Sequence, residues 1–450
     1  MNTEEMDIFP GMIDVWGQLP RMKGYTHLAA CFPRPATTPR KTIIAHLEGA
    51  TSQITTALPW LGGAVVIINK WDSKSTGDFT VARSPHTTNI LKVQDRSEIC
   101  PSFGDISKSK ASSDQLLGSW LSNESAMPDT YTESETNPAP VLTLTVSWIK
   151  GGLILDCAAQ HNILDMGGID QIFQLLATAL EGKHLGQEAI SVNTRDRANI
   201  FPLLSPKEKL HDHSAMRCPS SSTPALRKPQ SNTKPRSAFH CFRFNASSLS
   251  HLATLAKTPS TDDALSAFIW KRLSAIRQKG QNPDTLTGFS RAIDCRKTLD
   301  IPKEYMGVVV VKTASKMSFQ EIEEASLEEV AAQLRRDVRR IRQRRYLRSL
   351  ATLIVGECDK STFSFVSGFD PDAWINASSW AGTAVHRLEY GILGKPAFVR
   401  RPQSKPVQSL LYFLPSMDNG DIDVLLCLRD DEIQGLRDDV EWCRYAEYIG

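Results

Sequence analysis

The sequence lacks a long hydrophobic run, and no apolar stretch approaches the roughly 18 residues that a membrane helix needs. We therefore expect no membrane span. The sequence also lacks an excess of charge of either sign, because 52 Lys and Arg residues balance 50 Asp and Glu residues to give a formal net charge of +2. Without a broad basic field, we expect no nucleic-acid partner.

Paired cysteines and a targeting segment are also missing. The nine cysteines include no Cys-x-x-Cys pair, a pattern that favours reduced thiols over disulfides. Residues 1–10 have neither a basic start nor an apolar stretch, so we predict no secretory signal and a cytoplasmic location. The nearest approach to a metal site is His211, Asp212 and His213 with Cys218. It lies in a Pro- and Ser-rich segment without a complete tetrahedral ligand set, so we predict no metal.

The length and composition describe an ordinary globular protein of more than one domain. The 450 residues include 41% apolar and 23% charged residues, which excludes wholesale disorder. Two polar stretches interrupt the sequence, at Asp105–Pro140 and Leu204–Arg236. A long polar segment is expected between domains rather than within one. We therefore predict an N-terminal domain over 1–203, a linker over 204–236 and a C-terminal domain over 237–450.

Both halves mix strand and helix patterns, which predicts an α/β fold of α+β layers. Val141–Ile149 and Leu153–Ala159 are strand-like runs joined by a Lys-Gly-Gly hairpin signal, and apolar residues at helical spacing follow from Ile169 to Leu180. In the second half, Ser260 and Asp263 predict a capping box at the start of a helix. The remaining expected elements are strands at Leu286–Ile293, Gly307–Thr313, Thr362–Val366, Pro396–Arg400, Leu410–Leu414 and Asp423–Leu428, and a final helix at Asp431–Ile449.

One basic run, Arg335–Arg345, could suggest a nucleic-acid contact. Leu334, Val338 and Ile341 form an apolar stripe at helical spacing through this segment, and acidic residues precede it. This pattern is typical of an amphipathic helix with a solvated basic face.

The segment from Gln160 to Gly168 holds the strongest candidate for catalysis. It connects the second strand of the hairpin to the following helix, and such a turn can present His161 to a cleft. A histidine there can accept a proton near neutral pH, while Asp165 can orient the turn and the glycines can let a ligand approach the backbone. The His-x-x-x-acid spacing alone is weak evidence, because about one such pair is expected by chance and His184 with Glu188 is a second. A histidine that only caps a helix is the alternative.

Several motifs in one order carry more weight than this spacing. They are Asp14–Pro20 with Tyr25 and Thr26, Pro59–Gly63, His161–Asp165, Ser260–Trp270, Arg291–Arg296, Asn376–Gly382 and Gly394–Pro396. Together they resemble the BAHD acyltransferases, and within that family the fungal branch of trichothecene 3-O-acetyltransferase-like enzymes. The resemblance runs over nearly the whole sequence.

The resemblance implies two chloramphenicol-acetyltransferase-like domains with the active site in a tunnel at their interface. It implies transfer of an acyl group, most simply acetyl, from acyl-CoA to a hydroxyl or amine of a fungal secondary metabolite, in a ternary complex of a monomeric enzyme. Acyl-CoA is then a co-substrate, and no cofactor is bound permanently. His161 would be the general base. Ser378 and Trp380 would stabilise the oxyanion or position the substrate, and Asp165 would pair with Arg296 of the other domain in a structural role.

The second signature departs from the family pattern. The family has Asp-Phe-Gly-Trp-Gly, whereas this sequence has Glu389-Tyr390-Gly391-Ile392-Leu393-Gly394. We expect Glu389 and Gly391 to keep the structural role, with Glu389 in a salt bridge on a longer arm. The departure leaves two alternatives open. The same scaffold could catalyse a CoA-independent cyclisation or condensation, or it could be a non-catalytic binding protein.

Overall fold

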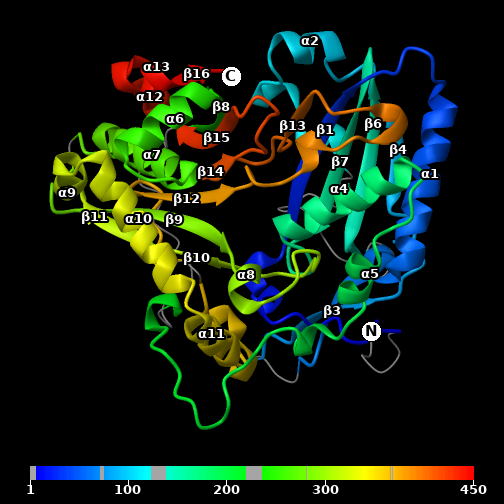
Figure 1. Cartoon of the computed structure of the whole chain (residues 1–450), viewed down its shortest axis with the longest axis horizontal. Helices are drawn as coiled ribbons and strands as arrows, with labels where there is room; N and C mark the ends of the chain where they lie inside the picture. Colours follow the sequence, from blue (N-terminus) through cyan, green and yellow to red (C-terminus); the bar gives the residue numbers. More distant parts are fainter. Residues whose placement is uncertain are drawn as a thin grey trace.

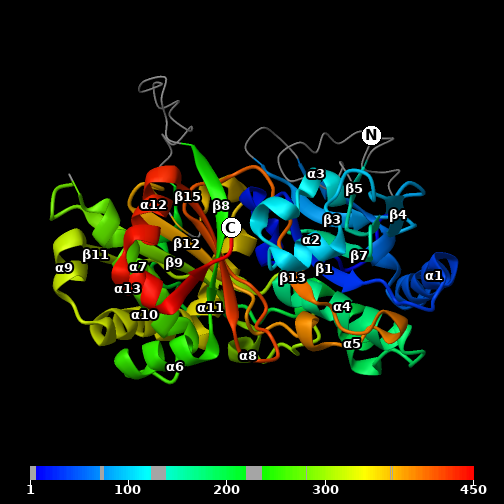
Figure 2. The ribbon, with the colours of Figure 1, turned by 90° about the horizontal axis from the view of Figure 1, so that it is seen from above.

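The computed structural model describes residues 7–70, 75–122, 138–218, 236–279, 281–364, 366 and 368–450. Two α/β halves lie side by side, each built on a β-sheet with helices packed against it (Figures 1 and 2). The first sheet has the strand order β13-β1-β7-β6-β4, and the second has the order β10-β9-β12-β14-β15-β8-β16 with β11 beside β9. The predicted two-layered α/β architecture is therefore confirmed.

The elements of the first half are β1 (Tyr25–Pro33), α1 (Arg40–Ala57), β2 (Ala64–Ile68), β3 (Asp78–Ala82), β4 (Leu91–Asp95), α2 (Phe103–Lys108), α3 (Gly118–Leu121), β5 (Ala139–Pro140), β6 (Leu142–Ile149), β7 (Gly152–Gln160), α4 (Met166–Leu180) and α5 (Gln187–Asn193). Those of the second half are β8 (Ser237–Phe244), α6 (Ala246–Leu255), α7 (Thr261–Arg277), β9 (Leu286–Asp294), α8 (Arg296–Leu299), β10 (Val310–Lys312), β11 (Ser315–Ser318), α9 (Phe319–Glu324), α10 (Leu327–Ile341), α11 (Arg344–Gly356), β12 (Trp374–Ser379), β13 (Phe398–Arg400), β14 (Leu410–Phe413), β15 (Ile422–Arg429), α12 (Asp430–Asp438), α13 (Val440–Tyr445) and β16 (Ala446–Tyr448). Short 3₁₀ turns connect several of them.

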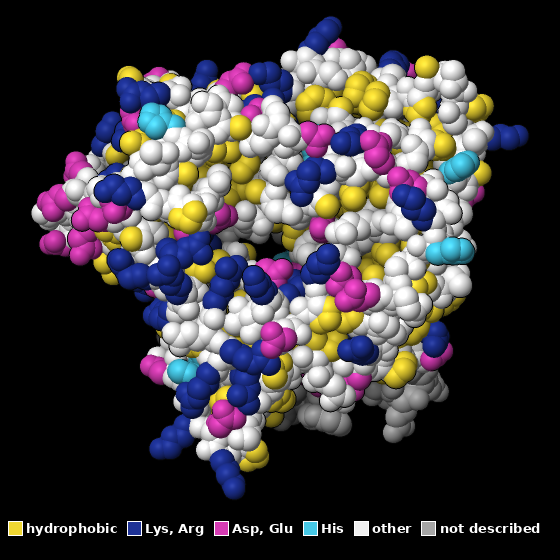
Figure 3. All heavy atoms as spheres, in the orientation of Figure 1, with side chains coloured by type: hydrophobic (Ala, Val, Ile, Leu, Met, Phe, Trp, Pro, Cys, Tyr) yellow, Lys and Arg dark blue, Asp and Glu magenta, His cyan; other side chains and the backbone are white. Residues whose placement is uncertain are grey.

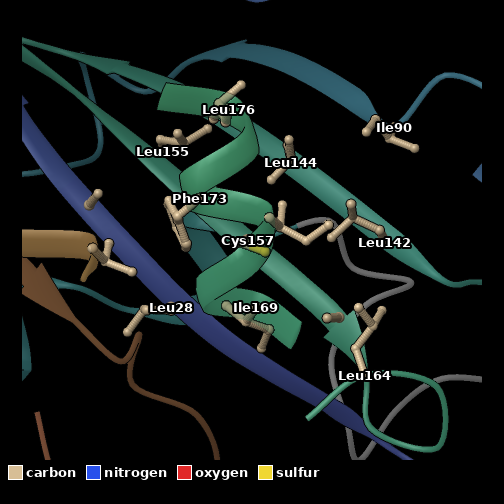
Figure 4. Close-up of a cluster of buried hydrophobic side chains, with 14 of the residues drawn as sticks. Leu28, Ile90, Leu142, Leu144, Leu155, Cys157, Leu164, Ile169, Phe173 and Leu176 are labelled. Atoms are coloured by element: carbon tan, nitrogen blue, oxygen red, sulfur yellow. The ribbon is translucent and has the colours of Figure 1, made fainter. Parts of the chain in front are cut away.

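The predicted hairpin and helix of the first half are both present. Strands β6 and β7 pair antiparallel, and Gly151 turns between them with a φ of +80°, a conformation that glycine adopts without strain. Helix α4 then crosses the sheet and buries Ile169, Phe173 and Leu176 against it (Figure 4). This packing fixes the start of α4, and with it the turn that carries His161.

The predicted capping box of α7 forms only in part. Ser260 caps the helix by accepting a hydrogen bond from the Asp263 backbone N–H. The Asp263 carboxylate does not return to the Ser260 backbone; it accepts from Arg291 at 2.7 Å and from Arg335 at 2.5 Å. The acid therefore ties α7 to β9 and α10. Helix α10 buries Leu334, Val338 and Ile341, the stripe expected of an amphipathic helix.

Two other predicted elements differ. The strand predicted over Thr362–Val366 is wrong, because a 3₁₀ turn occupies 360–362 and Phe363 forms only an isolated bridge; residue 365 lies outside the described residues. The final helix predicted over Asp431–Ile449 is broken into α12, α13 and β16. Asp439 ends the first helix and caps the second by accepting from the Trp442 N–H, and β16 then pairs with β8.

The strand predicted over Gly307–Thr313 is shorter at its start. The backbone N–H groups of Val308 and Val309 donate to the carboxylates of Asp14 and Asp165 at 2.9 and 3.0 Å. These donors are therefore used by carboxylates of the first half, and β10 begins only at Val310.

Segments of the two halves also interlock. Strand β13 belongs to the second half by sequence, yet it pairs antiparallel with β1 and completes the first sheet. The described part of the predicted linker, 204–218, runs beside α11, where Leu204 N–H donates to Thr352 and His211 N–H donates to Ser349. The rest of the linker, 219–235, lies outside the described residues. None of the helices in the described ranges is long and apolar enough to cross a membrane.

Candidate active site

A cavity of about 1240 Å³ lies between the two halves. Alternate residues of a strand face the same side of a sheet. Side chains at every second position of β9, β10, β12 and β14 therefore form one wall of the cavity. The wall residues are Ala292, Asp294, Val310, Lys312, Asn376, Ser378, Leu410 and Tyr412. His161 and the start of α4 supply the facing wall. Figure 3 shows a hollow near the centre of the molecule, with Lys and Arg side chains around part of its edge.

His161 lies in the turn between β7 and α4, and it lines the cavity. Its backbone N–H donates to the Gly24 carbonyl at 2.8 Å, and its ring Nδ1 lies 3.2 Å from the Leu164 carbonyl oxygen. A carbonyl can only accept, so Nδ1 carries the hydrogen and Nε2 keeps its lone pair. Burial lowers the pKa of His161, and the nearby Lys312 ammonium lowers it further, against the raising effect of Asp165. The lowered pKa favours the neutral ring, which is the form that can accept a proton.

The residues after His161 hold the turn in place. Asn162 is fully buried, and its amide donates to the carbonyls of Gly17 and Leu19, the latter at 3.1 Å. Ile163 and Leu164 point into the hydrophobic core. The buried residues after His161 thus anchor the turn, and the contact of Nδ1 with the Leu164 carbonyl orients the ring.

Asp165 is buried and links the two halves. Its carboxylate caps α4 by accepting from the Gly168 N–H at 3.0 Å, and it accepts from the Val309 N–H at 3.0 Å and from Arg296 Nη2 at 2.7 Å. Arg296 also donates to the carbonyl oxygen of Gly307 at 2.7 Å. The carboxylate is therefore engaged by the protein on both of its oxygens.

The glycines after Asp165 serve the contact between the halves. A Cβ on Gly168 would lie 2.3 Å from the Met306 carbonyl oxygen, and one on Gly167 would lie 2.9 Å from the Arg296 guanidinium. We expected these glycines to let a ligand approach the backbone. The structure instead uses the space for the second half, although Gly167 also borders the cavity.

Ser378 and Trp380 stand on or just after β12, and both line the cavity. The indole N–H of Trp380 donates to Ser378 Oγ at 3.0 Å, and its ring packs 4.7 Å from the ring of Tyr412. The indole is therefore directed at the hydroxyl, and the hydroxyl retains its own hydrogen for a further acceptor.

Glu389 and Gly391 do not line the cavity. Glu389 is exposed and makes no hydrogen bond or ion pair within the described part of the chain, so the salt bridge expected for it is absent there. Gly391 has a φ of +53°, and a Cβ there would lie 2.3 Å from the Leu180 carbonyl oxygen. A left-handed conformation against the end of α4 explains this glycine.

Lys312 and Asn376 are among the cavity-lining side chains that were not identified as site residues from the sequence. Lys312 Nζ donates to Asn376 Oδ1 at 2.9 Å, and burial lowers the pKa of Lys312 to about 8. The sequence feature that could have identified Lys312 is its position after four consecutive valines, because a lysine is unusual in a strand otherwise suited to the core.

His211 and His213, the nearest approach to a metal site in the sequence, have other partners. His211 Nε2 lies 2.9 Å from Arg345, and His213 Nε2 lies 2.9 Å from Ser349 Oγ. Over the described ranges, no group of three or more His, Cys, Asp or Glu side chains is arranged to hold a metal ion.

Comparison with known proteins identifies relatives over nearly the full length. Residues 25–180 match the trichothecene 3-O-acetyltransferase-like N-terminal domain, and residues 119–443 match the Transferase family. The chain is 38% identical to the O-acyltransferase pigD of Monascus ruber, over 97% of this chain and 98% of that protein. It is 31% identical to the trichothecene 3-O-acetyltransferase TRI101 of Fusarium sporotrichioides, over 97% of each chain.

The fold has a close counterpart among solved structures. The crystal structure of F. graminearum TRI101, complexed with coenzyme A and T-2 mycotoxin, superposes with a TM-score of 0.90 at 28% identity, over 98% of this chain and all of that one. The chain therefore is an acyltransferase and belongs to the Transferase family, the BAHD acyltransferases, in the branch that contains the trichothecene 3-O-acetyltransferases.

Proposed function

We propose that the protein transfers an acyl group, most simply acetyl, from acyl-CoA to a hydroxyl group of a small metabolite, with His161 as the general base. The observation that supports the proposal is the cavity itself, which is lined by His161 from the first half and by Ser378 and Trp380 from the second. The O-acyltransferase and O-acetyltransferase names of the relatives support a hydroxyl rather than an amine. The coenzyme A complexes of TRI101 support acyl-CoA as the donor.

The proposed reaction needs one proton carrier. His161 Nε2 removes the proton of the acceptor hydroxyl as the oxygen attacks the thioester carbonyl carbon, which forms a tetrahedral intermediate. The intermediate collapses by breaking its C–S bond, and the departing thiolate receives the proton from the imidazolium. The products are an ester and free CoA thiol. The hydrogen bond from Nδ1 to the Leu164 carbonyl supports this role, because it stabilises the tautomer with a basic Nε2.

Negative charge develops on the thioester oxygen during this step, and a donor at that point accelerates the reaction. We propose the Ser378 hydroxyl as the direct donor. The Trp380 N–H polarises the hydroxyl by donating to its oxygen. Trp380 is thus a positioning residue in this scheme, while Ser378 touches the reacting group.

The positive charge at the edge of the cavity is consistent with a negatively charged acyl donor. Four exposed cations lie on its lining: Lys23, Lys297, Lys303 and Arg342. The phosphates of CoA carry several negative charges, and cations at the mouth of a cleft raise the local concentration of an anionic substrate. We propose that this basic rim attracts the nucleotide end of acyl-CoA.

The test is an incubation of purified protein with acetyl-CoA and a panel of alcohols and amines. Thiol release with the matching mass gain on an alcohol supports the proposal. Turnover of a candidate without CoA would instead support a cyclisation or condensation on the same scaffold. CoA binding without turnover across the panel would support a binding protein. The cytoplasmic location, the monomeric state and the domain limits at 203 and 237 remain predictions.

A further inference from the structure

Lys312 is a cation in the cavity wall without a counter-charge. Its ammonium donates to Asn376 Oδ1 at 2.9 Å, and within the described residues no carboxylate forms an ion pair with it. An ammonium has three N–H donors, and a single amide oxygen satisfies one of them. Lys312 is half-buried in the wall, and a partly desolvated charge without a counter-charge is costly, so a binding role is a direct explanation for keeping it.

The position of Lys312 connects it to the reacting centre. It ends β10, beside β9, and its partner Asn376 stands on β12 two residues before Ser378, on the same face of the strand. Lys312 is also close enough to His161 for its charge to lower the pKa of that ring. In the proposed reaction, the free donors of Lys312 therefore lie near the place where the acceptor and the thioester meet.

We propose that Lys312 recognises the acceptor, and that the preferred acceptor carries an anionic oxygen, a carboxylate or an acidic enol, in addition to the hydroxyl that is acylated. Asn376 holds the ammonium in place on the wall. This inference rests on the proposed function, and it adds the chemical class of the acceptor to it.

The chemistry of the donor argues against CoA as the partner of Lys312. CoA carries its phosphates on the nucleotide end, and a long neutral pantetheine arm separates them from the thioester. A cation beside the general base is therefore near the neutral end of the donor. The exposed rim residues Lys297, Lys303 and Arg342 are better placed for the phosphates. At neutral pH Lys312 remains mostly protonated, since its pKa is lowered only to about 8.

The experiment compares hydroxy acids with their methyl esters. A panel of matched pairs of increasing size, beginning with 4-(hydroxymethyl)benzoate and its methyl ester, is titrated by calorimetry into the wild-type protein and into Lys312→Met. The expected result is tighter binding of at least one acid than of its ester by wild type, about 10- to 100-fold. Lys312→Met should abolish that preference and leave ester binding unchanged. Lys316→Met is the matched control, because Lys316 is exposed on the neighbouring strand β11 and does not line the cavity.

Binding is measured without acyl-CoA, so the inference can hold or fail separately from acyl transfer. No preference for any acid over its ester in the wild type overturns it, as does a preference that survives in Lys312→Met. With any acceptor that turns over, the variant should raise the KM for the acid and leave the KM for acetyl-CoA unchanged. A variant with raised KM for acetyl-CoA and unchanged acid binding would assign Lys312 to the donor and overturn the inference. Lys312→Met should fold, because methionine fills a similar volume and removes a partly desolvated charge, and thermal unfolding checks this.

Discussion

The Asp165 carboxylate lies 2.7 Å from the Arg296 guanidinium, across an interval of 131 residues in the sequence. Both side chains are buried, and Arg296 also donates to the Tyr305 and Gly307 carbonyls of its own half. The pair therefore couples the turn that carries His161 to the loop that precedes β10. We expect the pair to hold the two walls of the cavity in a fixed position relative to each other.

Replacing Asp165 should mainly reduce stability. Asp165→Ala removes the cap of α4 and leaves the buried Arg296 with only the exposed Asp294 carboxylate as a counter-charge, so we expect a loss of about 3–5 kcal/mol in the free energy of unfolding. Chemical denaturation measures the loss. Asp418→Ala breaks an exposed ion pair with Lys395 and should cost much less. A stable Asp165→Ala protein with selectively abolished turnover would contradict the structural role.

Replacing His161 should reduce turnover without unfolding the protein. His161→Ala removes the proposed base from the cavity wall, and we expect turnover to fall by about two to four orders of magnitude with an unchanged unfolding temperature. His184→Ala is the matched control, because His184 is exposed and shares only the chance spacing to an acid. Near-normal turnover by His161→Ala would remove His161 from the mechanism.

The pH dependence of kcat/KM should reflect the environment of His161. Its Nδ1 lies against the Leu164 carbonyl, and the charges of Asp165 and Lys312 both act on the ring. Burial together with the ammonium outweighs the acid and lowers the pKa of His161 below 6.5. The base is active when neutral, so kcat/KM should fall only as pH drops through a value below 6.5. Lys312→Met removes the cation, so the acid limb should move to higher pH, while Lys316→Met leaves it in place. A limb that is unchanged in Lys312→Met would mean that this ammonium does not act on the ring.

The local pattern of the sequence predicted the elements that build the first wall. The hairpin of β6 and β7 and the apolar stripe of α4 depend on neighbouring residues, so periodicity was sufficient to find them. The His161–Asp165 motif could also be found from the sequence, because its residues lie within a few positions of each other.

Other features of the fold and the site depend on contacts between residues far apart in the sequence, which the local pattern could not predict. Val308 and Val309 look like strand residues, but their N–H groups bind Asp14 and Asp165 from the other half, so β10 starts later. Strand β13 pairs with β1, from which it is separated in the sequence by most of both halves: Ala29 pairs with Arg400 and Cys31 with Phe398. Lys312 could not be recognised as part of the cavity, because its surroundings come from β9, β12 and the His161 turn. In each case the deciding partner lies far along the chain.

Gly391 and Glu389 should differ sharply in their effect on stability, although both belong to the second signature. Gly391→Ala forces a left-handed alanine against the Leu180 carbonyl, so we expect a loss of about 1–3 kcal/mol or more in the free energy of unfolding. Glu389→Ala should leave stability unchanged, since the side chain is exposed and forms no ion pair with the described residues. Gly356→Ala is the control, because a Cβ there meets no atom within 4 Å. A large loss of stability in Glu389→Ala would indicate that Glu389 does form the salt bridge predicted for it.

The proposed chain of hydrogen bonds, from Trp380 to Ser378 and from Ser378 to the thioester oxygen, can be tested by removing each donor. Ser378→Ala deletes the hydroxyl that we place on the oxyanion, so kcat should fall by about 10²- to 10³-fold, as for the loss of one oxyanion donor elsewhere. Trp380→Phe keeps an aromatic ring beside Tyr412 but removes the N–H that donates to Ser378 Oγ, so we expect a smaller loss, about tenfold.

The double variant separates a relay from two independent donors. If Trp380 acts only through the hydroxyl, then Trp380→Phe added to Ser378→Ala should lower kcat no further, since the group that it polarises is already gone. Trp148→Phe is the matched control, because its buried indole N–H has no hydrogen-bond partner among the described residues and lies outside the cavity. Multiplicative losses in the double variant would show that Trp380 contacts the reacting oxygen directly, and the indole would then count as a second donor.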